Sequence, residues 1–187
     1  MYLIQSCDPA HPDALVVLDR LSDALAAITG SNGRSSFEPS DVMAERALFV
    51  IARDERNSPV GCGAYRPLSP AIAEVKRMYA APGTIGLGAA ILACIEEQAV
   101  ADGYEALWLE TRLVNERAVR FYERHGYSRI LNFGKYIGRP EAVCFGKRLQ
   151  PTGAASTFRL GETQTSAVRA VAELQGGQAC QQQAEKS

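Results

Sequence analysis

The chain has 187 residues, of which 47% are hydrophobic and 22% are charged, so it can bury the core of one domain and is neither disordered throughout nor collagen-like. Twenty Lys and Arg nearly balance twenty-one Asp and Glu, and the missing basic excess argues against nucleic acid as a partner. The longest apolar runs are far shorter than the ~20 residues that span a bilayer, and the first residues do not form a signal peptide. We therefore expect a cytoplasmic protein with no membrane partner.

Hydrophobic spacing and turn residues divide the chain into strands and helices. In chain order, the predicted elements are a strand over 2–5, a helix from Pro12 to a stop at Gly30, a short helix capped by Ser40, strands over 47–52, 60–66 and 73–80, a helix over 85–101, a strand over 106–111, a helix over 116–125, and strands over 128–133 and 141–149. The alternation of helix and strand after residue 80 predicts parallel pairing in the middle of the sheet.

The two ends of the chain differ in composition. Residues 1–150 carry all the predicted elements and form the expected domain. Residues 151–187 contain six Gln, several Gly, Ser and Thr, and few large apolar groups, so they predict a low-complexity, disordered tail. An exposed final strand at the end of the domain could pair between subunits, which leaves a homodimer open.

The segment from residue 78 to 104 is the most informative part of the sequence. It contains the end of a strand, a GTIGLG turn and the start of a long helix. Glycines let backbone amides approach a phosphate, and the first helix turn adds unpaired N–H groups. The P-loop pattern is absent, and the turn follows the fourth strand, unlike a dinucleotide-binding fingerprint. The pattern predicts an anion-binding turn, with a plain strand-to-helix turn as the alternative.

A second motif follows the turn at a distance of one helix and one strand. Asn115, Ala118, Tyr122, Gly126 and Tyr127 are spaced as N-x-x-A-x-x-x-Y-x-x-x-G-[FY]. Together with a turn of the type Q/R-x-x-G-x-G/A, this order resembles the GCN5-related N-acetyltransferases over about residues 1–150. The resemblance implies an α/β (α+β) fold with a mixed, largely antiparallel sheet of about six or seven strands, parallel central strands and about four helices. It also implies acetyl-CoA as the acetyl donor and no metal.

The glycine turn departs from the family pattern. Gly86 and Gly88 match the motif glycines, whereas Gly83 stands where the family has Gln or Arg, and the turn is about two residues shorter. The resemblance implies that backbone amides of residues 84–89 hold the pyrophosphate, with binding weakened about ten-fold or more by the missing side chain. The amides of Met78 and Ala80 would face the thioester and pantetheine. The cofactor-binding residues implied are Met78, Ala80, Gly83, Thr84, Ile85, Gly86, Leu87, Gly88, Ala89, Asn115 and Tyr122.

Transfer to a primary amine requires a base, because an alkylammonium with a pKa near ~10.4 is almost fully protonated at pH 7. Glu74, on the strand before the glycine turn, is the leading candidate. Glu110, on the next strand, is the second. The alternative for each is a structural carboxylate that pairs with Lys76 or Arg112.

The leaving thiolate requires a proton donor, and the phenol of Tyr122 fits that role. The alternative is a buried aromatic side chain that anchors the helix to the sheet. Asn115 can cap the same helix and contact the pantetheine arm, or act as a cap alone.

The resemblance places the acceptor pocket between the first two helices and the last strands. Arg34 or Arg66 could hold an acceptor carboxylate, and Tyr136 lies in a loop beside them. The acceptor would then be a small-molecule amine or an amino acid. Two other functions remain open: an acetyl-CoA-binding sensory module with little or no turnover, and a protein or peptide N-acetyltransferase.

Overall fold

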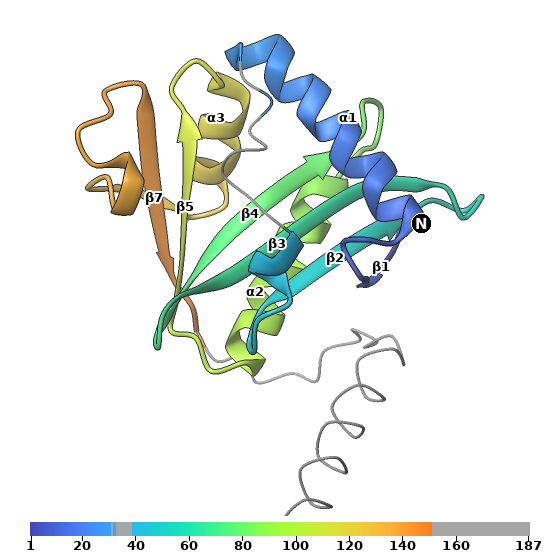
Figure 1. Cartoon of the computed structure of the whole chain (residues 1–187), viewed down its shortest axis with the longest axis horizontal. Helices are drawn as coiled ribbons and strands as arrows, with labels where there is room; N and C mark the ends of the chain where they lie inside the picture. Colours follow the sequence, from blue (N-terminus) through green and yellow to red (C-terminus); the bar gives the residue numbers. More distant parts are fainter. Residues whose placement is uncertain (31, 33–38, 151–187) are drawn as a thin grey trace, which may run out of the picture.

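A computed structural model describes residues 1–30, 32 and 39–150 of the chain. Seven strands form one sheet in the order β1-β2-β3-β4-β5-β7-β6 (Figure 1). Neighbouring strands are antiparallel except β4 and β5, which are parallel. The strands are β1 (Leu3–Ser6), β2 (Leu48–Arg53), β3 (Pro59–Ser69), β4 (Ile72–Ala80), β5 (Ala106–Arg112), β6 (Ser128–Ile130) and β7 (Ala142–Arg148). This mixed, largely antiparallel sheet with a parallel central pair confirms the predicted fold class.

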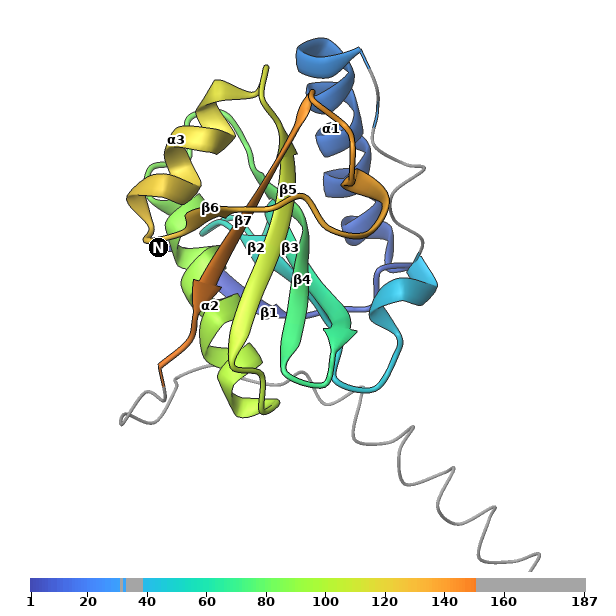
Figure 2. The ribbon, with the colours of Figure 1, turned by 90° about the vertical axis from the view of Figure 1, so that its left-hand side faces the viewer.

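Helices cover both faces of the sheet. Helix α1 lies on one face, and α2 and α3 lie on the other (Figure 2). In the described ranges, the short helix expected after Ser40 is a 3₁₀ turn of four residues, so three α-helices are present rather than about four. The helical elements are α1 (Pro12–Thr29), α2 (Leu87–Ala101), α3 (Glu116–Arg124), and the 3₁₀ turns η2 (Pro39–Val42) and η3 (Gly134–Tyr136).

Strand β2 shows how the sequence builds the two layers. Its six residues are all buried, and they alternate between faces with the period of a strand. Phe49 and Ile51 belong to the core cluster on the α1 side, whereas Val50 and Ala52 belong to the cluster on the α2 side. A continuous apolar run is therefore needed here, because helices cover both faces of the strand.

The last strand lies inside the sheet. Strand β7 pairs with β5 on one side and with β6 on the other, so the expectation that it offers a free edge to a second subunit is wrong. The physical reason is that the chain after helix α3 enters β6 two strand positions beyond β5, and β7 then fills the position between β5 and β6. The edge strands of the described sheet are β1 and β6.

The described ranges contain neither a membrane-spanning helix nor a cluster of metal-ligating side chains. No helix there is long and apolar enough to cross a bilayer. No group of three or more His, Cys, Asp or Glu is positioned there to hold a metal ion. The predicted C-terminal tail, residues 151–187, lies outside the described residues.

Candidate acyl-transfer site

The parallel strands β4 and β5 separate after a short pairing. They are paired only where Ile72, Ala73 and Glu74 face residues 106–108, at the start of each strand. Beyond Glu74 the two strands diverge, and Figure 1 shows the resulting V-shaped opening between them. Because the rest of β4 has no neighbour on this side, its outward-facing amides are available to a ligand.

A bulge in β4 occurs where the strands diverge. Cys62 pairs with Tyr79 and Ala64 pairs with Lys76, so the single residue between them on β3 faces two residues on β4, Arg77 and Met78. Arg77 has a φ of 54°, in the left-handed region that a non-glycine residue rarely adopts. The extra residue bends β4 and turns its last residues away from β5.

The register after the bulge fixes the direction of the Ala80 amide. The Ala81 N–H donates to the Val60 carbonyl at 2.8 Å, which makes Ala81 and Val60 a hydrogen-bonded pair. Hydrogen-bonded and non-bonded pairs alternate along an antiparallel ladder. The preceding pair, Ala80 and Gly61, is therefore non-bonded, and the Ala80 N–H points away from β3 into the opening.

The glycine turn presents unpaired amides at the start of α2. The first helical bond runs from the Ala90 N–H to the Gly86 carbonyl at 3.0 Å, which leaves the amides of residues 87–89 without a partner within the helix. Gly83 and Gly86 have φ values of 82° and 74°, and a Cβ added at either would meet no atom within 4 Å. The Thr84 amide instead donates to the Ala81 carbonyl at 3.2 Å. The turn therefore fits a phosphate through the amides of residues 85–89.

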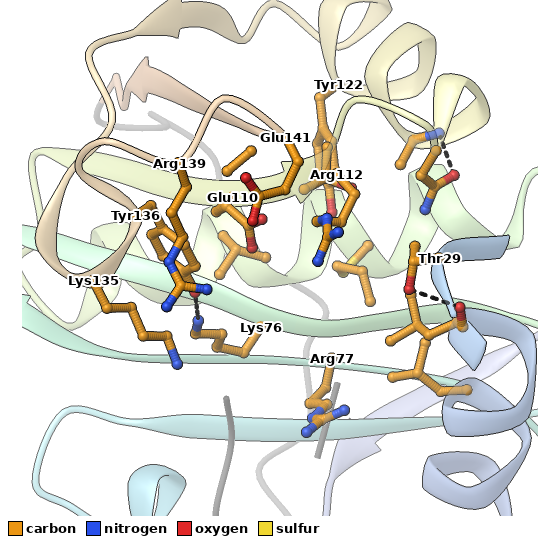
Figure 3. A pocket seen from close by; sticks show the side chains of 18 residues that line it. Thr29, Lys76, Arg77, Glu110, Arg112, Tyr122, Lys135, Tyr136, Arg139 and Glu141 are labelled. Atoms are coloured by element: carbon orange, nitrogen blue, oxygen red, sulfur yellow. Dashed lines mark hydrogen bonds between the residues drawn. The ribbon is translucent and has the colours of Figure 1, made fainter. Parts of the chain in front are cut away.

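A cavity of about 380 Å³ occupies the opening between β4 and β5 and extends to α1 (Figure 3). Its wall is formed by α1, β4, β5, α3 and the segment around η3. The lining residues are Leu21, Leu25, Thr29, Val75, Lys76, Arg77, Met78, Glu110, Thr111, Arg112, Asn115, Ala118, Tyr122, Lys135, Tyr136, Arg139, Glu141 and Ala142.

Tyr122 and Asn115 enter this cavity from α3. Tyr122 is 7% exposed, packs edge-on against Phe121 and Tyr127, and reaches into the cavity (Figure 3). Burial raises the pKa of its phenol well above the ordinary value, so the group keeps its proton at neutral pH. The Asn115 side chain accepts a hydrogen bond from the Ala118 N–H at 3.2 Å, which confirms the predicted helix cap. Tyr122 thus packs α3 and Asn115 caps it, and both side chains also face the cavity.

Glu74 is buried in an ion-pair network behind the cavity wall. Its side chain accepts from Arg66 Nε at 2.9 Å and lies 2.7 Å from Lys76 Nζ, while Arg66 also pairs with Asp41 at 2.8 Å. Lys76 in turn donates to the Tyr136 hydroxyl at 2.8 Å. Glu74 is only 1% exposed and does not line the cavity. This geometry favours the structural alternative for Glu74.

Glu110 is the carboxylate on β5 that faces the cavity. Burial raises its pKa, and the positive charges of Lys76 and Arg112 partly oppose that shift. A carboxylate with a raised pKa binds a proton more readily than an exposed one, which is the property a general base needs. On geometry, Glu110 is better positioned for proton transfer than Glu74.

The residues that the sequence predicted to bind the acceptor differ in their position relative to the cavity. Arg66 is engaged by two carboxylates, and it does not line the cavity. Tyr136 is 6% exposed and does line it. Arg34 lies outside the described residues.

Several cavity residues were missed by the sequence reasoning. No sequence motif includes Arg77, Arg139 or Glu141. Arg112 was predicted only as an ion-pair partner of Glu110. A signal for Arg112 exists in the sequence, because Glu110 and Arg112 are two positions apart on one strand and so share a face. Arg139 and Glu141 reach the cavity through the insertion of β7, which no local pattern indicates.

These features define a class of protein. A bulged β4 that separates from β5, a helix whose free amides begin at a glycine turn, and a cavity between the strands together form the scaffold of an acyltransferase. The Acetyltransferase (GNAT) family matches residues 19–127, which is more than half of the chain. The chain therefore belongs to the GNAT acetyltransferase family, which uses acetyl-CoA.

Relatives and solved structures agree with this assignment. The chain is 34% identical over 104 residues to an IAA acetyltransferase of Azospirillum brasilense, a match that covers 54% of this chain and 67% of that protein. It is 32% identical over 83 residues to an uncharacterized N-acetyltransferase of Schizosaccharomyces pombe, of which it spans about half. A Klebsiella pneumoniae structure classed as an acyl-CoA N-acyltransferase has 27% identity and a TM-score of 0.67, covering 80% of this chain and 99% of that one.

A further structure shows the fold alone. It is an aminoglycoside 6'-N-acetyltransferase complexed with coenzyme A, and it is 18% identical with a TM-score of 0.58. The superposition covers 81% of this chain and 99% of that chain.

Proposed function

We propose that the protein transfers the acetyl group of acetyl-CoA directly to the primary amine of a small molecule. Two observations support this: the phenol of Tyr122 lines the cavity between β4 and β5, and the first turn of α2 adjoins the end of β4, where a Cβ at Gly88 would lie 3.9 Å from that of Ala80. The volume of about 380 Å³ falls in the range of small-molecule pockets, which supports a small acceptor over a protein.

The donor would be held mainly by backbone groups. The amides of residues 85–89 would bind its pyrophosphate at the positive end of α2, and Asn115 and Met78 would contact its arm in the cavity. Gly83 leaves this contact without the Gln or Arg side chain that the family pattern has there. When bound, acetyl-CoA supplies an acetyl group as a thioester.

Three groups of this chain would then act on the reaction. Glu110 accepts a proton from the substrate ammonium, which frees the nitrogen lone pair to form the C–N bond. The Ala80 N–H donates to the carbonyl oxygen as negative charge develops on it. Tyr122 donates its proton to sulfur as the C–S bond breaks, and the second proton lost by the nitrogen restores the phenol, so the products are the N-acetyl compound, the CoA thiol and one proton on Glu110.

Release of the CoA thiol against a panel of amines, amino acids and peptides tests this proposal. We expect thiol release with at least one class of small amine, and a mass increase of one acetyl group on that amine. Titration calorimetry with acetyl-CoA provides the second measurement. Binding of acetyl-CoA without thiol release for any amine would contradict the proposed transfer and favour the sensory-module alternative.

A further inference from the structure

The charges around the cavity point to the kind of acceptor. Although the whole chain carries a formal charge of −1, the cavity is lined by five basic residues and only two acidic ones, Glu110 and Glu141. The basic residues are Lys76, Arg77, Arg112, Lys135 and Arg139. Glu74 compensates only one of these, through its contact with Lys76. The cavity wall is therefore net positive, although its reaction requires a cationic ammonium to enter.

Arg112 is a basic residue of the cavity whose hydrogen bonding is incomplete. Its Nε atom is buried and has no hydrogen-bond partner, and none of the described carboxylates forms an ion pair with the guanidinium. A buried N–H without an acceptor destabilises the protein by about 1–3 kcal/mol relative to one that is satisfied. A ligand carboxylate in the cavity would satisfy Nε together with a second N–H, in the two-bond geometry that a guanidinium favours.

The position of Arg112 relative to Glu110 fits a compact acceptor. The two residues are alternate positions of β5, so their side chains leave the same face and their Cα atoms are about 7 Å apart. A carboxylate held by Arg112 would leave the amine of the same molecule a few bonds away, within reach of Glu110. Exposed Lys135 and Arg139 at the rim would attract an anion toward the cavity.

We propose that the acceptor is a primary amine that also carries a carboxylate, as in an amino acid, and that Arg112 binds that carboxylate. This inference rests on the proposed function. It also predicts that polycationic amines are poor acceptors, because each further positive charge is repelled by the wall of the cavity.

Matched pairs of acceptors test the inference in the full-length protein. The kcat/KM for thiol release is measured for an amino acid and for its primary amide, which has the same amine but no carboxylate. We expect the amino acid to be preferred by about 10- to 150-fold, the effect of losing one charge-assisted contact. The amide has the lower ammonium pKa and hence more neutral amine, so a preference for the acid cannot come from protonation of the nucleophile.

Substitution of Arg112 assigns the preference to that residue. Arg112→Gln should abolish the preference, so that the ratio of kcat/KM for the amino acid to that for the amide falls to about one; a change in the pKa of Glu110 caused by the lost charge acts on both acceptors and does not alter this ratio. The matched control is Arg117→Gln, an exposed arginine on α3 outside the cavity, which should keep the preference. If Arg112→Gln is too unstable to assay, Arg112→Lys retains the charge without the paired geometry and should show a reduced preference.

The outcomes separate the two proposals. No thiol release with any acid, amide or polyamine would overturn the proposed function itself. Release that is equal or faster with the amide or with a polyamine would overturn only the anionic acceptor. An aminoalkyl phosphonate of equal chain length is included, and a preference for it over the carboxylate would overturn the assignment to a carboxylate.

Discussion

The substitution Gly86→Ala separates the folding role of the glycine turn from its proposed binding role. Gly86 caps α2 with φ 74° and ψ −7°, and a Cβ at this position would meet no protein atom within 4 Å. The added methyl group therefore creates no clash, and the change in stability comes from the left-handed backbone alone. That conformation destabilises a residue with a side chain by about 1–2 kcal/mol.

Gly30→Ala is a control with nearly the same backbone. Gly30 ends α1 with φ 73° and ψ 3°, a Cβ there would also meet no atom within 4 Å, and the residue does not line the cavity. Both variants should lower the free energy of unfolding by about 1–2 kcal/mol, which corresponds to a decrease in Tm of about 2–8 °C. Thermal unfolding without ligand measures this shared effect.

Binding of CoA should distinguish the two variants. In Gly86→Ala, the methyl group occupies open space beside the turn, and we expect it to displace a phosphate from at least one N–H. Loss of one hydrogen bond to a charged group, at about 1.5–3 kcal/mol, raises the Kd of CoA by about 10- to 150-fold. In Gly30→Ala the Kd should remain that of the parent protein. Calorimetry that finds equal Kd values in the two variants would refute the assignment of the phosphate to this turn.

Three other substitutions test the side chains of the site. Tyr122→Phe should lower kcat about 10²-fold with no change in the Kd of acetyl-CoA, and an unchanged kcat would show that the phenol is not the acid. Because burial makes Glu110 release its proton at a higher pH than an exposed carboxyl, kcat should rise with pH through a midpoint above the ordinary 4.5, and this limb should be absent in Glu110→Gln. Glu74→Gln should lower the free energy of unfolding by about 3 kcal/mol, since it leaves Lys76 and Arg66 without their shared carboxylate, while kcat of the folded protein stays close to that of the parent. Loss of kcat without loss of Tm would instead restore Glu74 as the base.

Short sequence patterns were sufficient to predict those parts of the site that a single helix or turn forms. The α2 turn was predicted from its glycines, and the α3 cap from Asn115 and the residues at helical spacing after it. Each of these features depends only on neighbours within about one turn of helix. The same holds for the end of α1 at Gly30, where the left-handed φ favours glycine.

Features that depend on strand order could not be predicted in this way. The position of β7 between β5 and β6 brings Arg139 and Glu141 to the cavity, although the sequence offered only a strand at the end of the domain. The choice between Glu74 and Glu110 also required the structure. Both are acidic residues on central strands, and only the three-dimensional neighbours show that Glu74 is paired inside the wall while Glu110 faces the cavity.

The close approach of α2 to the sheet links the core to the site. A Cβ at Gly63 would lie 2.7 Å from side-chain atoms of Ile91 and Ile95 and 2.8 Å from the sulfur of Met78, so α2 packs against β3 at a distance that only glycine permits. Gly63 is also the residue that faces the β4 bulge. The contact between α2 and β3 at Gly63 therefore lies next to the bulge at which β4 diverges from β5. Because a Cβ at Gly88 would lie 3.9 Å from that of Ala80, the first turn of α2 and the outward amide of β4 adjoin the same opening. The free amides at the start of the helix and the amide at the end of the strand are thus brought together by core packing, before any ligand is bound.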